Sequence, residues 1–234
     1  MTRTTPAQRH YDKTMAQKSE RKNNSGDPEK GSAYELMMPK LHTDLQRLKQ
    51  IHSVERKIKV KEEILPDYQP WIAGILESGL GAQDDILMTV LVWYIDVGNY
   101  QEAFKIAEYA LRHNLVMPDQ YTRNLATFLL DEISGAMLRQ KPETSESVEE
   151  VLSVLRKTEE LTVLHDAPDQ ARAKLYKALA FALMAKIGDG DVTKEQEPDA
   201  MDAAACLNRA IELDERSGVK NELKRLEKRL ERVS

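Results

Sequence analysis

The sequence predicts an all-α protein with a long N-terminal helix followed by a stack of helical hairpins. Apolar residues recur at three- and four-residue spacing along most of the chain, and no window shows the alternation of a strand. Prolines and glycines fall mainly between these periodic segments. With 234 residues and a single cysteine, Cys206, the chain can bury a sizeable core without any internal disulfide.

Positive charge is concentrated near the N-terminus. Residues 1–61 hold 14 Lys and Arg against 7 Asp and Glu, a net charge of +7. Residues 62–234 hold 20 against 32, a net charge of −12. This division favours a polyanion-binding region on an acidic body. We expect no membrane span, because no run of eighteen apolar residues exists, and no secretory signal at the polar N-terminus.

Residues 1–30 are predicted to form a basic DNA-binding arm. Thr5 and Pro6 are typical of a helix start, and the helix would run to about Lys22 before a breaker-rich linker at residues 23–28. A flexible chain end is the alternative, because this segment is polar on nearly all faces. The residues expected to contact DNA here are Arg3, Gln8, Arg9, His10, Lys13, Lys18, Arg21 and Lys22.

Residues 33–65 are predicted to form one long helix with a single narrow apolar stripe. Such a helix needs a partner helix, so we expect oligomerisation through this segment. The stripe residues are Leu41, Leu45, Leu48, Ile51 and Ile58. The charged face is explained either by solvation or by contact with DNA. In the second case the contacting residues are Arg47, Lys49, Arg56, Lys57, Lys59 and Lys61.

Residues 66–234 are predicted to form a helical-repeat-like body. Small residues at positions 103, 107 and 110, between Trp93 and Pro118, follow the general layout of a tetratricopeptide hairpin. Further amphipathic helices are expected at about 119–139, 146–165 and 169–187. The last helix, at residues 220–232, is expected to cap the stack or to offer a seam to a partner, rather than to be a nucleic-acid arm.

Motifs for common cofactor chemistry are missing from the sequence. The chain lacks a phosphate-binding Gly-x-x-x-x-Gly-Lys-Ser/Thr loop, and its five histidines are scattered. We therefore predict no cofactor, apart from Mg²⁺ if the chain is a nuclease. The candidate catalytic residues of such a metal-dependent nuclease are Asp84, Asp85 and Asp96. Capping of a helix at residues 83–97 also explains the first two, and about 16 Å of helix would separate Asp85 from Asp96.

The run GAQDDILMTV at Gly81–Val90, with Trp93, Asp96 and Gly98 after it, resembles the small terminase subunit of temperate tailed phages with cohesive DNA ends. Further similar segments are TPAQRH at Thr5–His10, the pairs Leu65-Pro66 and Pro70-Trp71, and AEYALRHNLVMP at Ala107–Pro118. The likeness covers most of the chain and is strongest at residues 65–118.

The resemblance implies a role in packaging viral DNA in the cytoplasm of the bacterial host. Small subunits of this family bind the packaging site on concatemeric double-stranded phage DNA, recruit a large subunit that carries the ATPase, and often form homo-oligomeric rings. In this family the small subunit is designated the endonuclease component. We favour a non-catalytic DNA-binding subunit. The alternatives are a metal-dependent endonuclease that cuts the cohesive-end site and a tetratricopeptide-like protein–protein scaffold.

Overall fold

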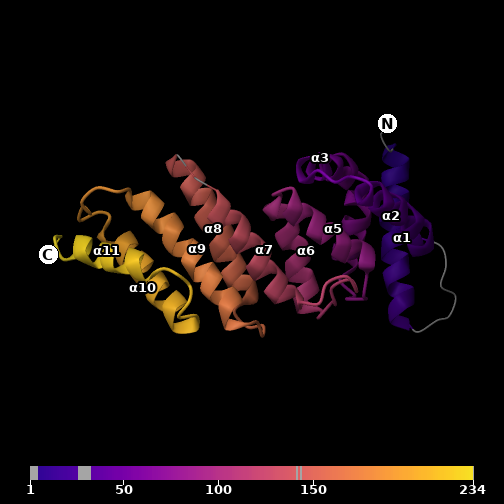
Figure 1. The fold of residues 1–234 in the computed structure, drawn as a ribbon. Coiled ribbons are helices and arrows are strands. Elements are labelled where there is room, and N and C mark those ends of the chain that lie inside the picture. The colour runs from indigo at the N-terminus through magenta and orange to yellow at the C-terminus, as the bar shows by residue number, and fades with distance from the viewer. Residues whose placement is uncertain (1–4, 26–32, 141, 143, 234) are drawn as a thin grey trace. The chain divides into compact units, whose positions relative to one another are not determined.

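The structure, a computed structural model, consists of helices joined by short connections (Figure 1). It describes residues 5–25, 33–140, 142 and 144–233, and the remaining residues lie outside its description. Within these ranges it contains no strand, so the all-α prediction is confirmed. None of the described helices is both long and apolar enough to cross a membrane.

The chain divides into two compact units, residues 1–122 (unit 1) and 123–234 (unit 2). This boundary differs from the predicted divisions at residues 30 and 65. Unit 1 contains α1 (Pro6–Ser25), α2 (Ala33–Lys49), α3 (Val54–Ile64), the 3-10 helix η1 (Leu65–Asp67), α4 (Gln69–Ser78), α5 (Asp85–Asp96) and α6 (Tyr100–Arg112). Its core centres on α5, in which every residue from Ile86 to Ile95 is buried.

The single helix predicted for residues 33–65 is wrong, because residues 50–53 separate α2 from α3. Ser53 has an extended backbone, with φ −70° and ψ 124°. Its hydroxyl oxygen accepts a hydrogen bond from the backbone nitrogen of Arg56 at 3.3 Å. A side-chain cap of this kind satisfies a free donor at a helix start, so it begins a new helix at Val54.

Helix α1 packs along α4. This packing argues against the alternative that the N-terminal segment is a flexible chain end. A Cβ atom at Gly74 would lie 2.4 Å from the backbone oxygen of Lys13 and 2.9 Å from the Cβ of Ala16, so only glycine permits this approach. Ala16 is fully buried, and the Lys13 ammonium lies 2.5 Å from the Glu77 carboxylate. Residues 6–25 are therefore part of the fold of unit 1.

Unit 2 is a succession of helices in which each contacts the next, and α7 also contacts α9. Its helices are α7 (Leu125–Arg139), α8 (Ser145–Thr162), α9 (Asp169–Ile187), α10 (Glu197–Leu213) and α11 (Lys220–Leu230). Ala180, Ala203 and Ala210 on α9 and α10 are fully buried. Side chains this small let neighbouring helices approach closely. The tetratricopeptide-like geometry of these pairs stays a prediction.

Candidate nucleic-acid interface

The first turns of α1 expose two of the predicted DNA-contacting residues, Arg9 and His10. Lys13 instead pairs with Glu77 on α4. Arg3 lies outside the described residues, and so do the side chains of Gln8, Lys18, Arg21 and Lys22. Among the described side chains of this group, Arg9 and His10 are exposed and Lys13 is half-buried.

Half of the cations predicted to bind DNA from residues 47–61 have a carboxylate partner. A guanidinium nitrogen of Arg47 lies 3.0 Å from Glu63. Lys59 lies 3.1 Å from Glu55, and Lys61 pairs with Asp96. Surface pairs of this kind contribute only about 0.2–1 kcal/mol. Their carboxylates nevertheless cancel positive charge where a phosphate would have to approach.

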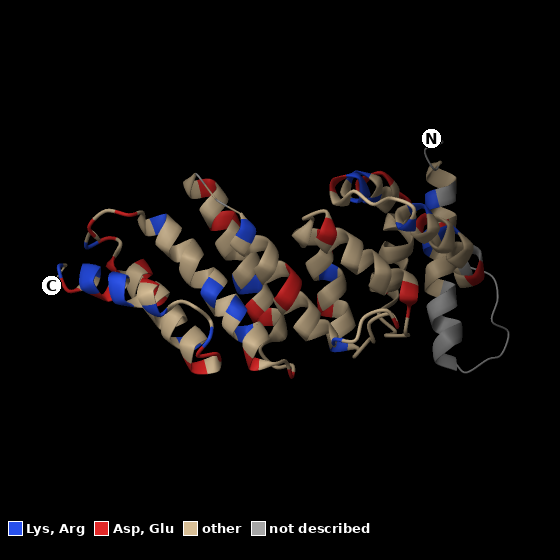
Figure 2. Ribbon diagram, in the orientation of Figure 1, with Lys and Arg blue, Asp and Glu red and all other residues tan. Residues whose placement is uncertain are grey.

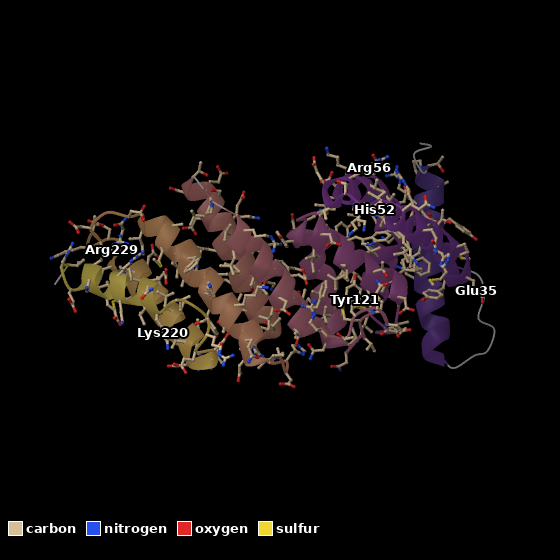
Figure 3. All side chains as sticks on the ribbon, viewed as in Figure 1. Glu35, His52, Arg56, Tyr121, Lys220 and Arg229 are labelled. Carbon is tan, nitrogen blue, oxygen red and sulfur yellow. The ribbon has the colours of Figure 1, made fainter. Side chains whose placement is uncertain are left out.

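The other three cations of this group, Lys49, Arg56 and Lys57, form no ion pair with any described residue. Lys49 and Arg56 are exposed and Lys57 is half-buried. Arg56 and His52 lie at the outer edge of α3 and the preceding turn (Figure 3). The unpaired cations of this group therefore lie around the turn between α2 and α3 and on the start of α3.

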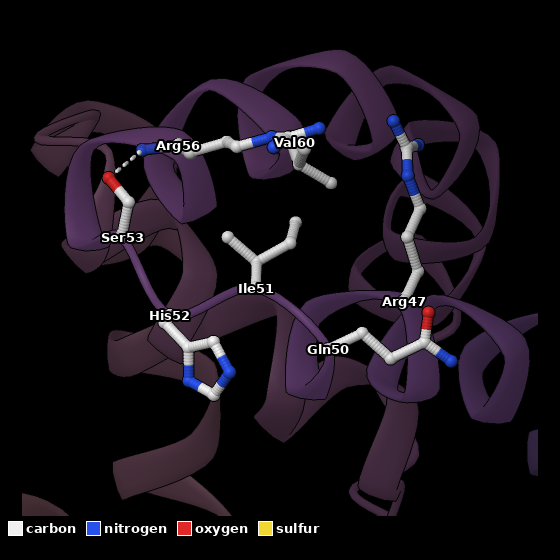
Figure 4. A pocket seen from close by; sticks show the side chains of 7 residues that line it. All are labelled: Arg47, Gln50, Ile51, His52, Ser53, Arg56 and Val60. Atoms are coloured by element: carbon white, nitrogen blue, oxygen red, sulfur yellow. Dashed lines mark hydrogen bonds between the residues drawn. The ribbon is translucent and has the colours of Figure 1, made fainter.

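A hollow of about 480 Å³ lies at this turn. Its lining residues are Arg47, Gln50, Ile51, His52, Ser53, Arg56 and Val60. In Figure 4 the polar side chains surround Ile51 and Val60, which lie toward the middle of the group. The Arg56 guanidinium, the Gln50 amide and the His52 imidazole supply hydrogen-bond donors to a phosphate or a sugar, whereas the Arg47 guanidinium is paired with Glu63. The two aliphatic side chains offer apolar contact.

Sequence reasoning missed this hollow, and it gave no role to Gln50 or Ser53. A signal was present, since Ser53 followed by Glu55 is typical of an N-cap with an acid in the first turn. Recognising that cap would have divided the long helix and placed a turn among the cations. The shape of the hollow depends on how α3 folds back, which the local sequence does not specify.

The apolar stripe predicted for oligomerisation is largely used within the chain. Leu41 and Leu48 are 2% and 6% exposed. These two side chains support unit 1 and do not present a surface to a second copy, which corrects that part of the prediction. Leu45, Ile51 and Ile58 are half-buried.

Asp84, a candidate catalytic residue, caps α5. One of its carboxylate oxygens accepts a hydrogen bond from the backbone nitrogen of Leu87 at 2.8 Å, and the other accepts one from the indole nitrogen of Trp71 at 3.0 Å. Burial raises the pKa of Asp84 to about 6, although these hydrogen bonds oppose the shift. Both carboxylate oxygens are therefore occupied by structural contacts.

The other two candidate catalytic residues do not complete a metal centre with Asp84. Asp85 is exposed at the start of α5, and Asp96 pairs with Lys61 at its end. A helix of 12 residues separates the two ends, which corresponds to about 16 Å along its axis. Across the described part of the chain, no three His, Cys, Asp or Glu side chains are grouped to hold a metal ion. Asp84, Asp85 and Asp96 therefore do not converge on one metal position.

These features define a class of protein: an all-α chain with exposed cations around the α2–α3 turn and with Asp84 as the N-cap of α5. A family model described as phage small terminase subunit matches residues 38–170. The chain therefore belongs to the phage small terminase subunit family.

Two curated relatives are similar over most of their length. The chain is 40% identical over 227 residues to the "Terminase, endonuclease subunit" of Escherichia phage P2, covering 97% of this chain and 86% of that protein. It is 27% identical over 205 residues to the "Probable terminase, endonuclease subunit" of Haemophilus phage HP1, covering 86% and 71%. No solved structure matches the chain.

Proposed function

We propose that this chain is the DNA-binding subunit of a phage packaging terminase. It binds the cohesive-end packaging site on concatemeric DNA in the cytoplasm of the bacterial host and recruits the ATPase large subunit. The observation that carries the proposal is the group of donors around the α2–α3 turn, within the region that matches the family model. Phosphate contacts from such donors position a protein on a duplex, and contacts to base edges add sequence preference.

Several copies acting together would strengthen this binding. Linked weak contacts gain from effective concentration, so a homo-oligomeric ring holds DNA more tightly than one subunit does. The half-buried Leu45 and Ile58 are the members of the predicted stripe best placed to contribute to such an assembly. Leu41 and Leu48 are excluded because unit 1 already buries them.

A salt series of DNA affinities tests the proposed function. Full-length wild type, Arg56→Ala and Lys59→Ala are each titrated with cohesive-end and random duplex DNA. Each lost phosphate contact reduces the magnitude of the negative slope of log K against log salt by about 0.9. We expect a decrease of about one for Arg56→Ala. Lys59 serves as the matched control, because its ammonium is already paired with Glu55.

The proposal fails if wild type binds neither duplex, or if Arg56→Ala and Lys59→Ala behave alike. An absence of DNA binding by wild type would favour the protein–protein scaffold. Preference for the cohesive-end duplex over the random one separates site recognition from general affinity for DNA.

A second candidate function is cutting of the cohesive-end site by this chain itself. The printed names of both relatives, which call them endonuclease subunits, favour it. The capping role of Asp84 opposes a centre built from Asp84, Asp85 and Asp96. Mg²⁺-dependent nicking by the purified chain alone, abolished by Asp85→Asn with an unchanged melting temperature, would favour it. Cutting that needs the large subunit and survives Asp85→Asn would reject it.

A further inference from the structure

Helix α11 at the end of unit 2 carries a row of cations. Lys220, Lys224 and Lys228 follow one another at four-residue spacing, and Arg232 continues the spacing just after the helix ends. Side chains four residues apart lie on the same face of a helix. All four residues are exposed, as is Arg225 beside them. Figure 2 shows the blue segments of α11.

Contacts on the opposite side of α11 fix the direction in which this row points. Leu226 is fully buried. A guanidinium nitrogen of Arg229 donates hydrogen bonds to the backbone oxygens of Gly188 and Gly190 at 2.8 and 2.6 Å. Figure 3 marks Lys220 and Arg229 on this helix. Because α11 is held on its Leu226 and Arg229 side, the row of lysines faces solvent.

The row is unlike the other exposed charge pairs of the protein. Lys59 with Glu55 and Arg112 with Glu108 are both four residues apart and of opposite charge. Like charges at this spacing destabilise a helix. A row of like charges therefore opposes folding, and an anionic ligand would relieve the repulsion.

The middle of the row also lacks carboxylate partners. Lys220 lies 2.8 Å from Glu215, and Arg232 lies 3.3 Å from Asp191. Lys224, Arg225 and Lys228 form no ion pair with any residue that the structure describes. Glu227 and Glu231 follow Lys224 and Lys228 by three residues, so they lie next to the row on the helix, yet neither forms an ion pair with a described residue.

The spacing of the row suits a nucleic-acid backbone. Four residues of helix rise about 6 Å, and a single strand of duplex DNA presents a phosphate about every 3.4 Å along its axis. Successive lysines can therefore reach successive or alternate phosphates. An acidic protein surface offers carboxylates without such a regular repeat.

We propose that the exposed face of α11, formed by Lys220, Lys224, Arg225 and Lys228, is a second contact surface for duplex DNA. This inference rests on the proposed function only in taking DNA as the ligand. The surface lies on unit 2, whereas the α2–α3 turn lies on unit 1. The contact reads no sequence and adds to the affinity for any duplex.

The test compares full-length wild type with a Lys224→Gln, Lys228→Gln double variant, using a random-sequence duplex across a salt series. An Arg156→Gln, Lys194→Gln variant is the control, since both residues are exposed cations of unit 2 without ion pairs among the described residues. We expect the magnitude of the salt slope to fall by about 2 in the α11 variant, with about tenfold lower affinity per lysine near 0.1 M salt. The control should match wild type.

Stability of the same variants separates binding from folding. Removing like charges should leave the melting temperature of the α11 variant unchanged or slightly higher. A wild-type salt slope in that variant, or an equal loss in the control, overturns the inference. An acidic protein as the true ligand would give the first of these results. Failure of wild type to bind any duplex would instead overturn the proposed function.

Discussion

Helix α3 in unit 1 and helix α11 in unit 2 are both 11 residues long and rich in cations. On α3, two of the four cations, Lys59 and Lys61, are paired with carboxylates. On α11 the cations are aligned with one another, and Lys224 and Lys228 have no partner among the described residues. The number of cations in a helix therefore does not tell which of them can bind a ligand; the position of the carboxylates does.

Because both carboxylate oxygens of Asp84 have partners within the protein, we expect this residue to affect stability. The dependence of the unfolding free energy on its protonation is the largest effect we predict. Burial raises its pKa from 3.8 to about 6, so the folded state binds the proton more tightly than the unfolded state. The contribution of this carboxyl to the unfolding free energy is greatest below about pH 4 and falls by about 3 kcal/mol as the pH rises through about 6.

Replacement of Asp84 by Asn should remove this dependence, because Asn caps a helix about as well as Asp. Urea denaturation of wild type and Asp84→Asn at a series of pH values measures it. As the pH rises through about 6, the unfolding free energy of wild type should fall relative to that of Asp84→Asn. Parallel curves would show that the carboxyl is not held in a buried, charge-disfavouring position.

A smaller effect is expected where α1 meets α4. The Cβ introduced by Gly74→Ala would collide with the backbone of Lys13, and such overpacking costs about 1–3 kcal/mol. Gly190→Ala is the control, since its Cβ would meet nothing within 4 Å. Chemical denaturation compares the two variants. Equal stability would mean that α1 is held by its ion pair with Glu77 and not by close packing.

Breaking a surface ion pair on α3 should cost less. Glu55→Gln removes the partner of Lys59, so stability should fall by about 0.3–0.5 kcal/mol at low salt. The loss should vanish at high salt, because the pair is exposed. Thermal denaturation at two salt concentrations measures it, and a loss that persists at high salt would contradict the pairing.

The smallest expected change is an increase in folding stability. Lys224→Gln removes a like-charge neighbour of Lys220 and Lys228, so stability should rise by about 0.2–0.5 kcal/mol. The same denaturation experiment detects it. A decrease would mean that Lys224 contributes a stabilising contact, and the distinction between α3 and α11 would weaken.

Local signals made much of the fold predictable. The acids before Ile86 and the glycine at position 98 correctly placed the start and end of α5. The break after Lys49 was missed, because the apolar residues before and after it keep similar spacing and the cap at Ser53 is a single side-chain contact. Periodicity averages over several turns, so it does not detect one hydrogen bond.

The candidate site was less predictable than the fold. Lys61 and Asp96 are 35 residues apart, and Lys13 and Glu77 are 64 apart, so their pairing depends on the tertiary structure. The sequence identified the cations but could not separate paired from unpaired ones. The periodic row of lysines on α11 was visible in the sequence, yet its exposed orientation required the buried Leu226 and the anchored Arg229.

The most direct test of the central claim compares two double variants with equal changes of charge. Lys59→Gln, Lys105→Gln removes exposed lysines that lie beside carboxylates, and Lys224→Gln, Lys228→Gln removes exposed lysines that do not. The salt slope of duplex binding is measured for both with wild type. We predict a decrease in its magnitude of less than one for the first and of about 2 for the second. Equal decreases would contradict the claim that the unpaired cations of α11, and not total charge, hold the DNA.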